Sequence, residues 1–248
     1  MPKIYFENQV GPILDSVFLP TPSIYAVPEE WKALPKIVDG SADGEPISIS
    51  DNLPNRKIRT RRMCPAINDA FNFGYTLYSL TDIYINAEND DFIEVNAPID
   101  ISPPYITEGM VTTIIESKHI QGYNKKYFHK IPIKIFVGFS IKTDPGYSCW
   151  FTSPIGNNNL PIEAVDAVID TDMLAAGRPF SFFVHKGFNG TLSAGTPILQ
   201  VIPFKRDTFT KVIVEDFSEK EDMNNSFKLA SKFSNAYKNF FWQRKKFL

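Results

Sequence analysis

The chain has 248 residues, a formal net charge of -2 and 43% hydrophobic residues, so it can bury one large core and has no general attraction to nucleic acid or anionic membranes. Aromatic residues make up 14% of the chain, and 19 prolines outnumber 13 glycines, which argues against disorder and suits short strands joined by stiff loops. The start carries no export signal and no apolar run is long enough to cross a bilayer, which predicts cytoplasmic synthesis without membrane insertion.

Prolines dominate the first 55 residues and define the first predicted segment. Each proline removes a backbone donor and fixes φ, so this density interrupts helices and central strands. The aromatic side chains between the prolines can dock on another surface. We therefore expect residues 1–55 to form a proline-rich arm that wraps over a core. The prolines are Pro2, Pro12, Pro20, Pro22, Pro28, Pro35, Pro46 and Pro54.

Apolar residues alternate with period two from about residue 56 onward, as at Ile83 and Ile85, and this pattern predicts strands. Gly, Pro and Asn turns separate many such short runs, and few stretches show helical periodicity. We therefore expect residues 56–215 to form a mainly β core, either a barrel or a sandwich. The predicted strands cover 75–79, 82–85, 92–95, 111–115, 131–141, 148–151, 167–170, 180–184, 196–203 and 211–214.

The last segment, residues 216–248, has helical periodicity instead. Apolar and aromatic side chains recur there at three- and four-residue steps, which predicts an amphipathic helix with one aromatic face. Basic residues follow at Arg244, Lys245 and Lys246, where positive charge complements the dipole of a helix end. The face consists of Phe227, Ala230, Phe233, Ser234, Tyr237, Phe240 and Phe241.

A basic run lies at residues 55–62 and has two interpretations. Its charges suit the phosphates of RNA, DNA or a nucleotide. Because no aromatic residue is interleaved, a solvated strand or a subunit contact is the other interpretation. The basic residues are Arg56, Lys57, Arg59, Arg61 and Arg62.

The two cysteines, Cys64 and Cys149, are expected to be free and buried, because no export signal accompanies them. The histidines, His119, His129 and His185, lack metal-ligand spacing. We interpret them as surface histidines or as core histidines with satisfied hydrogen bonds.

A pair of carboxylates, Asp170 and Asp172, follows an apolar run at the end of a predicted strand. Residues at i and i+2 lie on the same side of an extended chain, so the pair could hold a divalent cation or orient a water molecule. Aspartates at a strand end are also common in turns, where they accept backbone N–H bonds. Local chemistry leaves both interpretations open.

Four segments carry short sequence motifs. In chain order they are 70–79, 135–146, 166–172 and 192–202. In this order they resemble the dUTPase and dCTP deaminase superfamily over about residues 68 to 205. The resemblance implies a β-clip jelly roll or barrel that assembles as a trimer. Cys64-Pro65, with segments 146–149, 168–172 and 195–206, also resembles an uncharacterised group of phage-encoded proteins. That likeness implies a viral origin, other phage proteins as partners, and a location in the host cytoplasm or the virion.

The same resemblance assigns roles to particular residues. Asp170 falls where the superfamily places the carboxylate that activates water, and Asp172 would help to hold magnesium. The nucleotide-binding positions would be Ser153, Gly156 and Gln200, and Arg178 could substitute, from a neighbouring loop, for the phosphate-binding arginine of the superfamily.

The chain also departs from the superfamily pattern. Met173 replaces a tyrosine that packs against base and sugar, and the loop 153–156 lacks the usual phosphate-binding arginine. The Gly-rich C-terminal arm that closes over the phosphates is replaced by the predicted aromatic helix.

Each missing catalytic contact lowers the reaction rate, and the reductions from several missing contacts multiply. We therefore expect a noncatalytic oligomer without a cofactor that acts by assembly or by ligand binding. One alternative is a divergent magnesium-dependent deoxynucleotide pyrophosphatase. A second is a nucleic-acid-binding module, which requires the basic run and the basic tail to form one patch.

Overall fold

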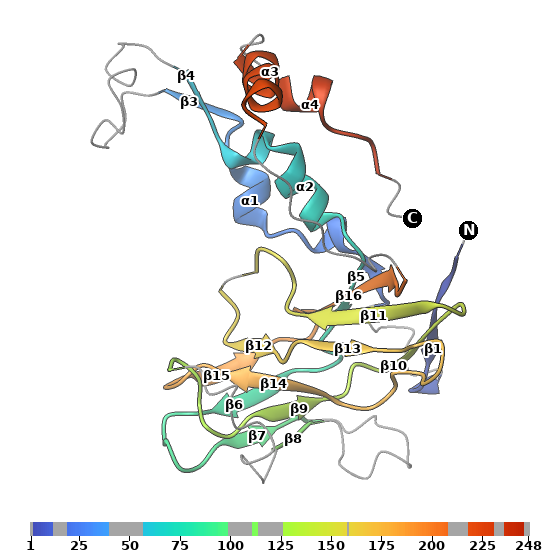
Figure 1. Cartoon of the computed structure of the whole chain (residues 1–248). Coiled ribbons are helices and arrows are strands. Elements are labelled where there is room, and N and C mark those ends of the chain that lie inside the picture. The colour runs from blue at the N-terminus through green and yellow to red at the C-terminus, as the bar shows by residue number, and fades with distance from the viewer. Residues whose placement is uncertain are drawn as a thin grey trace. The chain divides into compact units, whose positions relative to one another are not determined.

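The computed structural model describes residues 2–11, 19–39, 57–98, 111–113, 126–157, 159–207, 218–230 and 236–245 (Figure 1). Of these residues 36% lie in strands and 21% in helices, which confirms the predicted mainly β class. The sheets are antiparallel and none of the described sheets closes, so the barrel form of the prediction is not confirmed.

The chain divides into two compact units. The β-rich unit comprises Met1–Ala26 and Gly74–Thr208, and the helical unit comprises Val27–Phe73 and Phe209–Leu248. These limits differ from the expected divisions at residues 55 and 215. The first strands pair within the β-rich unit, whereas Asp69, shortly before Gly74, accepts a hydrogen bond from Trp242 of the C-terminal segment.

The largest sheet of the β-rich unit has five strands. Cys149 and Phe151 point to the interior from one strand, while Trp150 between them is on the other face, as alternation requires. The order is β13 (Ala167–Ile169), β11 (Tyr147–Thr152), β16 (Pro197–Lys205), β5 (Tyr75–Tyr78) and β2 (Thr21–Pro22).

A four-stranded sheet lies within the same unit. Its Phe180 ring stacks on Phe151 of β11, with centroids 4.8 Å apart, so the two sheets share one core. The order is β12 (Ile162–Ala164), β14 (Phe180–Val184), β9 (Ile133–Ile135) and β8 (Val111–Thr113).

The described strands of the β-rich unit also form two smaller sheets. One has the order β15 (Asn189–Leu192), β6 (Ile83–Asn86) and β7 (Glu94–Asn96), and the other pairs β1 (Ile4–Asn8) with β10 (Phe139–Thr143). The expected strand 131–141 is two strands, β9 and β10, because Gly138 adopts φ +80 between them. The expected strand 211–214 lies outside the described residues.

The expected N-terminal arm is not confirmed as such. Its residues 4–8 form β1 along β10, residues 21–22 form β2, and a 3-10 helix, η2 (Ser23–Ala26), follows. Residues 1, 12–18 and 40–55 of the expected arm lie outside the described residues.

The helical unit contains short elements from both ends of the chain. Trp31 of α1 (Glu29–Ala33) packs on Phe71 of α2 (Pro65–Phe71), with ring centroids 4.7 Å apart. Between them β3 (Ile37–Asp39) pairs with β4 (Lys57–Arg59), and η4 (Arg61–Met63) precedes α2. The predicted C-terminal helix is described as α3 (Glu219–Ala230) and α4 (Ala236–Phe240). None of the described helices has the length and apolar character needed to span a membrane.

Candidate functional site

The two predicted site carboxylates lie in a tight turn after β13. The backbone N–H groups of Met173 and Leu174 both donate to the carbonyl oxygen of Asp170, at 2.9 Å each. Farther along, Ala176 exchanges two backbone hydrogen bonds with Ile141 of β10, which fixes this segment against the β1–β10 sheet. The turn therefore places Asp170 and Asp172 at defined positions beside the β10–β11 turn.

Asp172 is held by a two-point contact with Arg206. Arg206 donates from Nη1 to Oδ1 and from Nη2 to Oδ2, both at 2.6 Å, and the Gly146 N–H adds a third bond to Oδ2 at 2.8 Å. The Asp172 side chain is only 4% exposed. These hydrogen bonds, chiefly those from Arg206, hold the pKa of Asp172 well below its usual range despite burial. Asp172 thus links the β10–β11 turn, the β13 turn and the end of β16.

Asp170 is the accessible member of the pair. Its side chain is 60% exposed, and Oδ1 accepts a hydrogen bond from Ser148 Oγ at 2.6 Å. Arg206 Nη1 lies 3.6 Å from the same oxygen. Asp170 can therefore act as a hydrogen-bond acceptor or as a base, whereas Asp172 is already engaged.

A buried hydroxyl and thiol network lies directly behind this turn. The Thr143 and Thr171 hydroxyls are 2.7 Å apart, and Thr171 Oγ1 donates to Cys149 Sγ at 3.3 Å. Burial raises the pKa of Cys149 to about 11, so its thiol stays protonated. Both cysteines are free, as predicted, but Cys64 is only partly buried.

A cavity of about 650 Å³ opens between β13, the turn that follows it and β14. This volume falls in the range of about 300 to 1,000 Å³ that is typical of small-molecule sites. Most of its wall is apolar, and its polar side chains are Gln9, Ser140, Arg178 and Ser181. The apolar lining residues are Val165, Ala167, Ile169, Leu174, Ala175, Ala176, Pro179 and Phe180.

Gln9 is the most unusual of these polar residues. Its Oε1 atom is buried, and no donor of the described residues reaches it. Gly177 leaves room for the amide, since a Cβ atom at that position would stand 2.8 Å from Gln9 Nε2. Buried acceptors are normally satisfied, so this oxygen is suited to a donor from a ligand.

Only one of the predicted nucleotide-binding residues, Arg178, lines this cavity. Ser153 Oγ accepts the Ala164 N–H, and Gln200 Oε1 accepts the Ile155 N–H, both at 2.8 Å. Gly156 has φ +85 in the same loop. These three residues therefore shape the β11–β12 loop and are not among the cavity-lining residues.

The basic run falls in the helical unit. Arg56 lies outside the described residues, and Lys57 and Arg59 are at the two ends of β4. Arg61 and Arg62 lie on η4, and Arg62 Nη1 donates to the Leu34 carbonyl at 2.8 Å. Thus the run is part of a folded surface.

Within the described part of the chain, no three His, Cys, Asp or Glu side chains are grouped as ligands for a metal ion. His129 is buried, and its Nε2 lies 2.8 Å from the Asn89 carbonyl oxygen, so its interpretation as a satisfied core histidine is confirmed. His185 packs against the Phe128 ring, and His119 lies outside the described residues.

Two residues of the site, Arg206 and Gln9, were not predicted from the sequence. Each meets its neighbours through long-range pairing: Arg206 follows β16, and Gln9 follows β1. Arg206 lies in the 195–206 segment noted above, but nothing local indicates that it contacts Asp172.

No protein-family model matches the chain, and the search of curated proteins found no match. The architecture and the site therefore define a mainly β protein with a small, largely apolar cavity. The resemblance to the dUTPase superfamily stays a prediction.

Proposed function

We propose that the chain is a noncatalytic, oligomeric protein on a dUTPase-like scaffold, and that it binds a small ligand in the cavity between β13 and β14. The observation that carries the proposal is the buried Gln9 Oε1 atom, which lines an apolar cavity and has no donor from the described residues. A ligand donor would satisfy that acceptor on binding.

The cavity lining defines the chemistry of the ligand. Apolar walls favour a compact ring system, and Gln9 favours an N–H donor on its edge. Arg178 is exposed and can pair with an anionic group such as a phosphate. A nucleotide combines all three features.

Two features of the turn after β13 support binding without catalysis. Asp172 already accepts hydrogen bonds from Arg206 and Gly146, so its oxygens are engaged in the fold. Met173, in the position of the superfamily's base-packing tyrosine, is 82% exposed. Because loss of one preorganised contact costs about 10²- to 10³-fold in rate, several such losses leave little turnover.

Exposed apolar side chains around the same turn support self-association. Val168 of β13 and Leu174 are largely exposed, as is Met173, and Trp150 beside Val168 is partly exposed. Contiguous exposed apolar residues are typical of contact surfaces between subunits. We propose a trimer, in keeping with the resemblance.

The test is a thermal-shift screen of the full chain against deoxynucleotides, with and without magnesium. A ligand that binds only the folded state raises the midpoint temperature of unfolding. At a ligand concentration one hundred times Kd, it stabilises the folded state by about 2.7 kcal/mol. Gln9→Met and Arg178→Ala should reduce the shift, whereas Lys142→Ala on exposed β10 surface should not. Absence of a shift with every nucleotide would refute ligand binding and leave an assembly role.

The exposed carboxylate of Asp170 favours one second candidate, a divergent nucleotide pyrophosphatase. There Asp170 would activate water, and magnesium would have to be held by phosphate and Asp170. Asp170→Asn should then abolish magnesium-dependent turnover without changing the melting temperature. Turnover that survives in that variant would exclude this candidate.

A further inference from the structure

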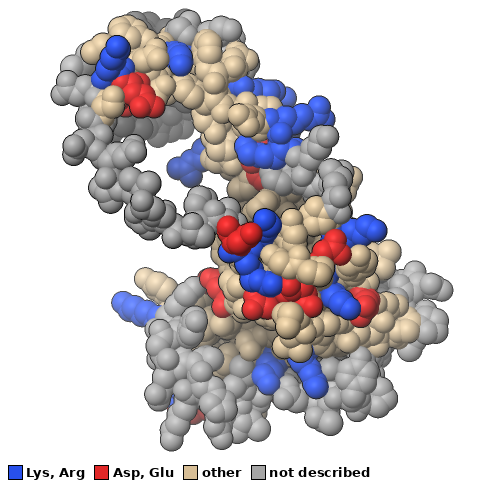
Figure 2. All heavy atoms as spheres, turned by 45° about the vertical axis from the view of Figure 1, so that its right-hand side comes forward, with Lys and Arg blue, Asp and Glu red and all other residues tan. Residues whose placement is uncertain are grey.

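The helical unit has a charge balance opposite to that of the β-rich unit. Residues 27–73 and 209–248 contain more Lys and Arg than Asp and Glu, whereas the rest of the chain contains fewer. Figure 2 shows several Lys and Arg side chains close together on the visible face of this unit. The lining of the cavity between β13 and β14 includes none of the cations of the helical unit.

Two neighbouring residues of α2, Asn68 and Asp69, contact the basic run and the basic tail, respectively. Asn68 Nδ2 donates to the carbonyl oxygen of Arg62, at 2.9 Å. Asp69 Oδ2 accepts hydrogen bonds from Trp242 Nε1 at 2.7 Å and from Lys245 Nζ at 2.6 Å. α2 therefore contacts both basic segments, which are far apart in sequence.

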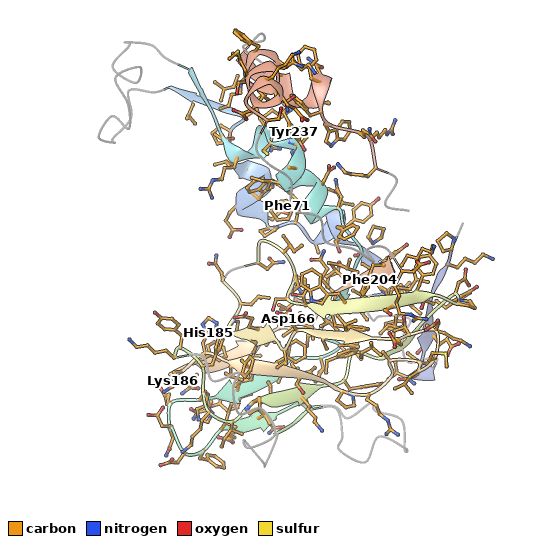
Figure 3. All side chains as sticks on the ribbon, viewed as in Figure 1. Phe71, Asp166, His185, Lys186, Phe204 and Tyr237 are labelled. Atoms are coloured by element: carbon orange, nitrogen blue, oxygen red, sulfur yellow. The ribbon has the colours of Figure 1, made fainter. Side chains whose placement is uncertain are left out.

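Aromatic rings at α4 and its C-terminal end are open to solvent. Tyr237 is 40% exposed and Phe241 36%, and their rings are nearly parallel with centroids 6.5 Å apart. Figure 3 labels Tyr237 on α4, among the side chains of this unit. Exposed rings of this kind are usually covered by a partner or by ligand rings.

Each ring region has a lysine beside it. Lys228 Nζ lies 5.9 Å from the Phe241 centroid, and Lys238 and Lys245 lie 5.8 and 5.6 Å from that of Trp242. Cation–π contacts of this kind are weak at exposed sites. A nucleobase could therefore displace the lysine from the ring face, and the lysine ammonium group could then contact a phosphate.

We propose that this tail surface, formed by Tyr237, Lys238, Phe241, Arg244 and Lys245, binds single-stranded nucleic acid. Rings that stack on bases, interleaved with cations that contact phosphates, are the two components of single-strand binding. A duplex hides its base faces and would use only the cations.

Charge distinguishes this ligand from a second copy of the chain. Within the described part of the structure, Lys238 and Arg244 of this surface lie within salt-bridge distance of no carboxylate. A symmetric contact through the tail surface would bring these cations against their own copies, which is unfavourable. A polyanion neutralises them.

The first experiment is fluorescence anisotropy of labelled oligothymidylate and oligouridylate with the full chain, over a range of salt concentrations. We expect binding that weakens steeply with salt. Lys238→Ala and Arg244→Ala should each reduce the slope of log K against log salt by about 0.7. The two oligonucleotides show whether DNA or RNA is preferred, and a duplex of equal length should bind more weakly.

Aromatic variants test the stacking contribution. Tyr237→Ala and Phe241→Ala should weaken binding by roughly 5- to 150-fold. The matched controls are Tyr127→Ala, whose side chain is 73% exposed on the β-rich unit, and Lys142→Ala. Neither should change the affinity. Circular dichroism melting confirms that each variant is folded.

Three results would overturn this proposal. One is the absence of oligonucleotide binding at low salt, and another is equal affinity in the tail-surface variants and the controls. The third is self-association, in the absence of oligonucleotide, that is lost in Phe241→Ala. The cavity variant Gln9→Met should leave oligonucleotide binding unchanged, which separates this surface from the proposed ligand cavity.

Discussion

The carboxylate of Asp172 ties three parts of the β-rich unit together through Arg206 and Gly146, and its ionisation should therefore affect folding. Because its pKa in the folded state is lowered, the stabilisation is present above the unfolded pKa of about 3.9 and is lost as the pH falls through the folded value. Asp172→Asn should be less stable at neutral pH and should lose less stability on acidification.

Urea unfolding of the wild type and of Asp172→Asn, from pH 7 down to the acid range, measures this difference. Asp207→Asn is the control, because its partner Lys205 is exposed and surface ion pairs contribute little. Parallel pH profiles for wild type and Asp172→Asn would contradict the structural role of the Arg206 contact.

Gly74 offers a second prediction at the scale of a single residue. It has φ +80, and a Cβ atom there would stand 2.2 Å from the Val201 carbonyl oxygen. Gly74→Ala should destabilise the protein by more than the roughly 1 to 3 kcal/mol of backbone strain alone. Gly187 has φ +74 and open space around an added Cβ atom. The free energy of unfolding of Gly187→Ala should therefore fall only by the backbone strain. Denaturant titration compares the two, and equal losses would exclude a steric role for Val201.

The cysteines should differ in reactivity. Cys64 is partly buried, whereas Cys149 is fully buried and its pKa is raised to about 11 by burial. A thiol-specific chromogenic reagent should therefore modify Cys64 in the native protein and Cys149 only after unfolding. Fast modification of Cys64→Ser would show that Cys149 is accessible after all.

At the scale of elements, the contact between Phe151 of β11 and Phe180 of β14 connects the two largest sheets. Phe151→Ala should reduce the free energy of unfolding by about 3 to 5 kcal/mol, because the side chain is completely buried. Phe92→Ala is the matched control, since that side chain is 61% exposed. Chemical denaturation should give a clearly smaller loss for the control.

Strands with regular alternation could be predicted from the sequence, and β5, β6, β11, β14 and β16 were found within a few residues of their predicted limits. The signal is local there, because one face of each strand is buried. β1 and β2 were missed because they are short strands at the start of a proline-rich region and are specified by their partners β10 and β5.

The same limit applies to the candidate site. The Asp170 and Asp172 pair could be located because a strand end is visible in the sequence. Its partners could not be found, since Arg206 reaches Asp172 only through the register of β16 on β11, and Gln9 reaches the cavity through β1. Long-range pairing leaves no local signal.

For the whole molecule, the expected oligomer is directly measurable. Sedimentation velocity at micromolar concentration should give a trimer that persists after magnesium is removed, if the exposed side chains around β13 form the subunit contact. Val168→Lys should shift the protein toward the monomer, because it places a charge in that contact. A wild-type monomer at this concentration would contradict the proposed assembly.

The connections between the two units have one further consequence. The chain leaves the β-rich unit after β2, returns just before β5 and leaves again after β16, and these three strands are neighbours in one sheet. The Ser23 N–H donates to the Gly74 carbonyl at 3.0 Å, so the first exit and the re-entry are adjacent. Residues 27–73 thus connect two neighbouring antiparallel strands, as a hairpin loop does. A short turn in their place would leave the strand order of the sheet unchanged. The helical unit thus has the connectivity of one insertion, between β2 and β5, combined with a segment that follows β16.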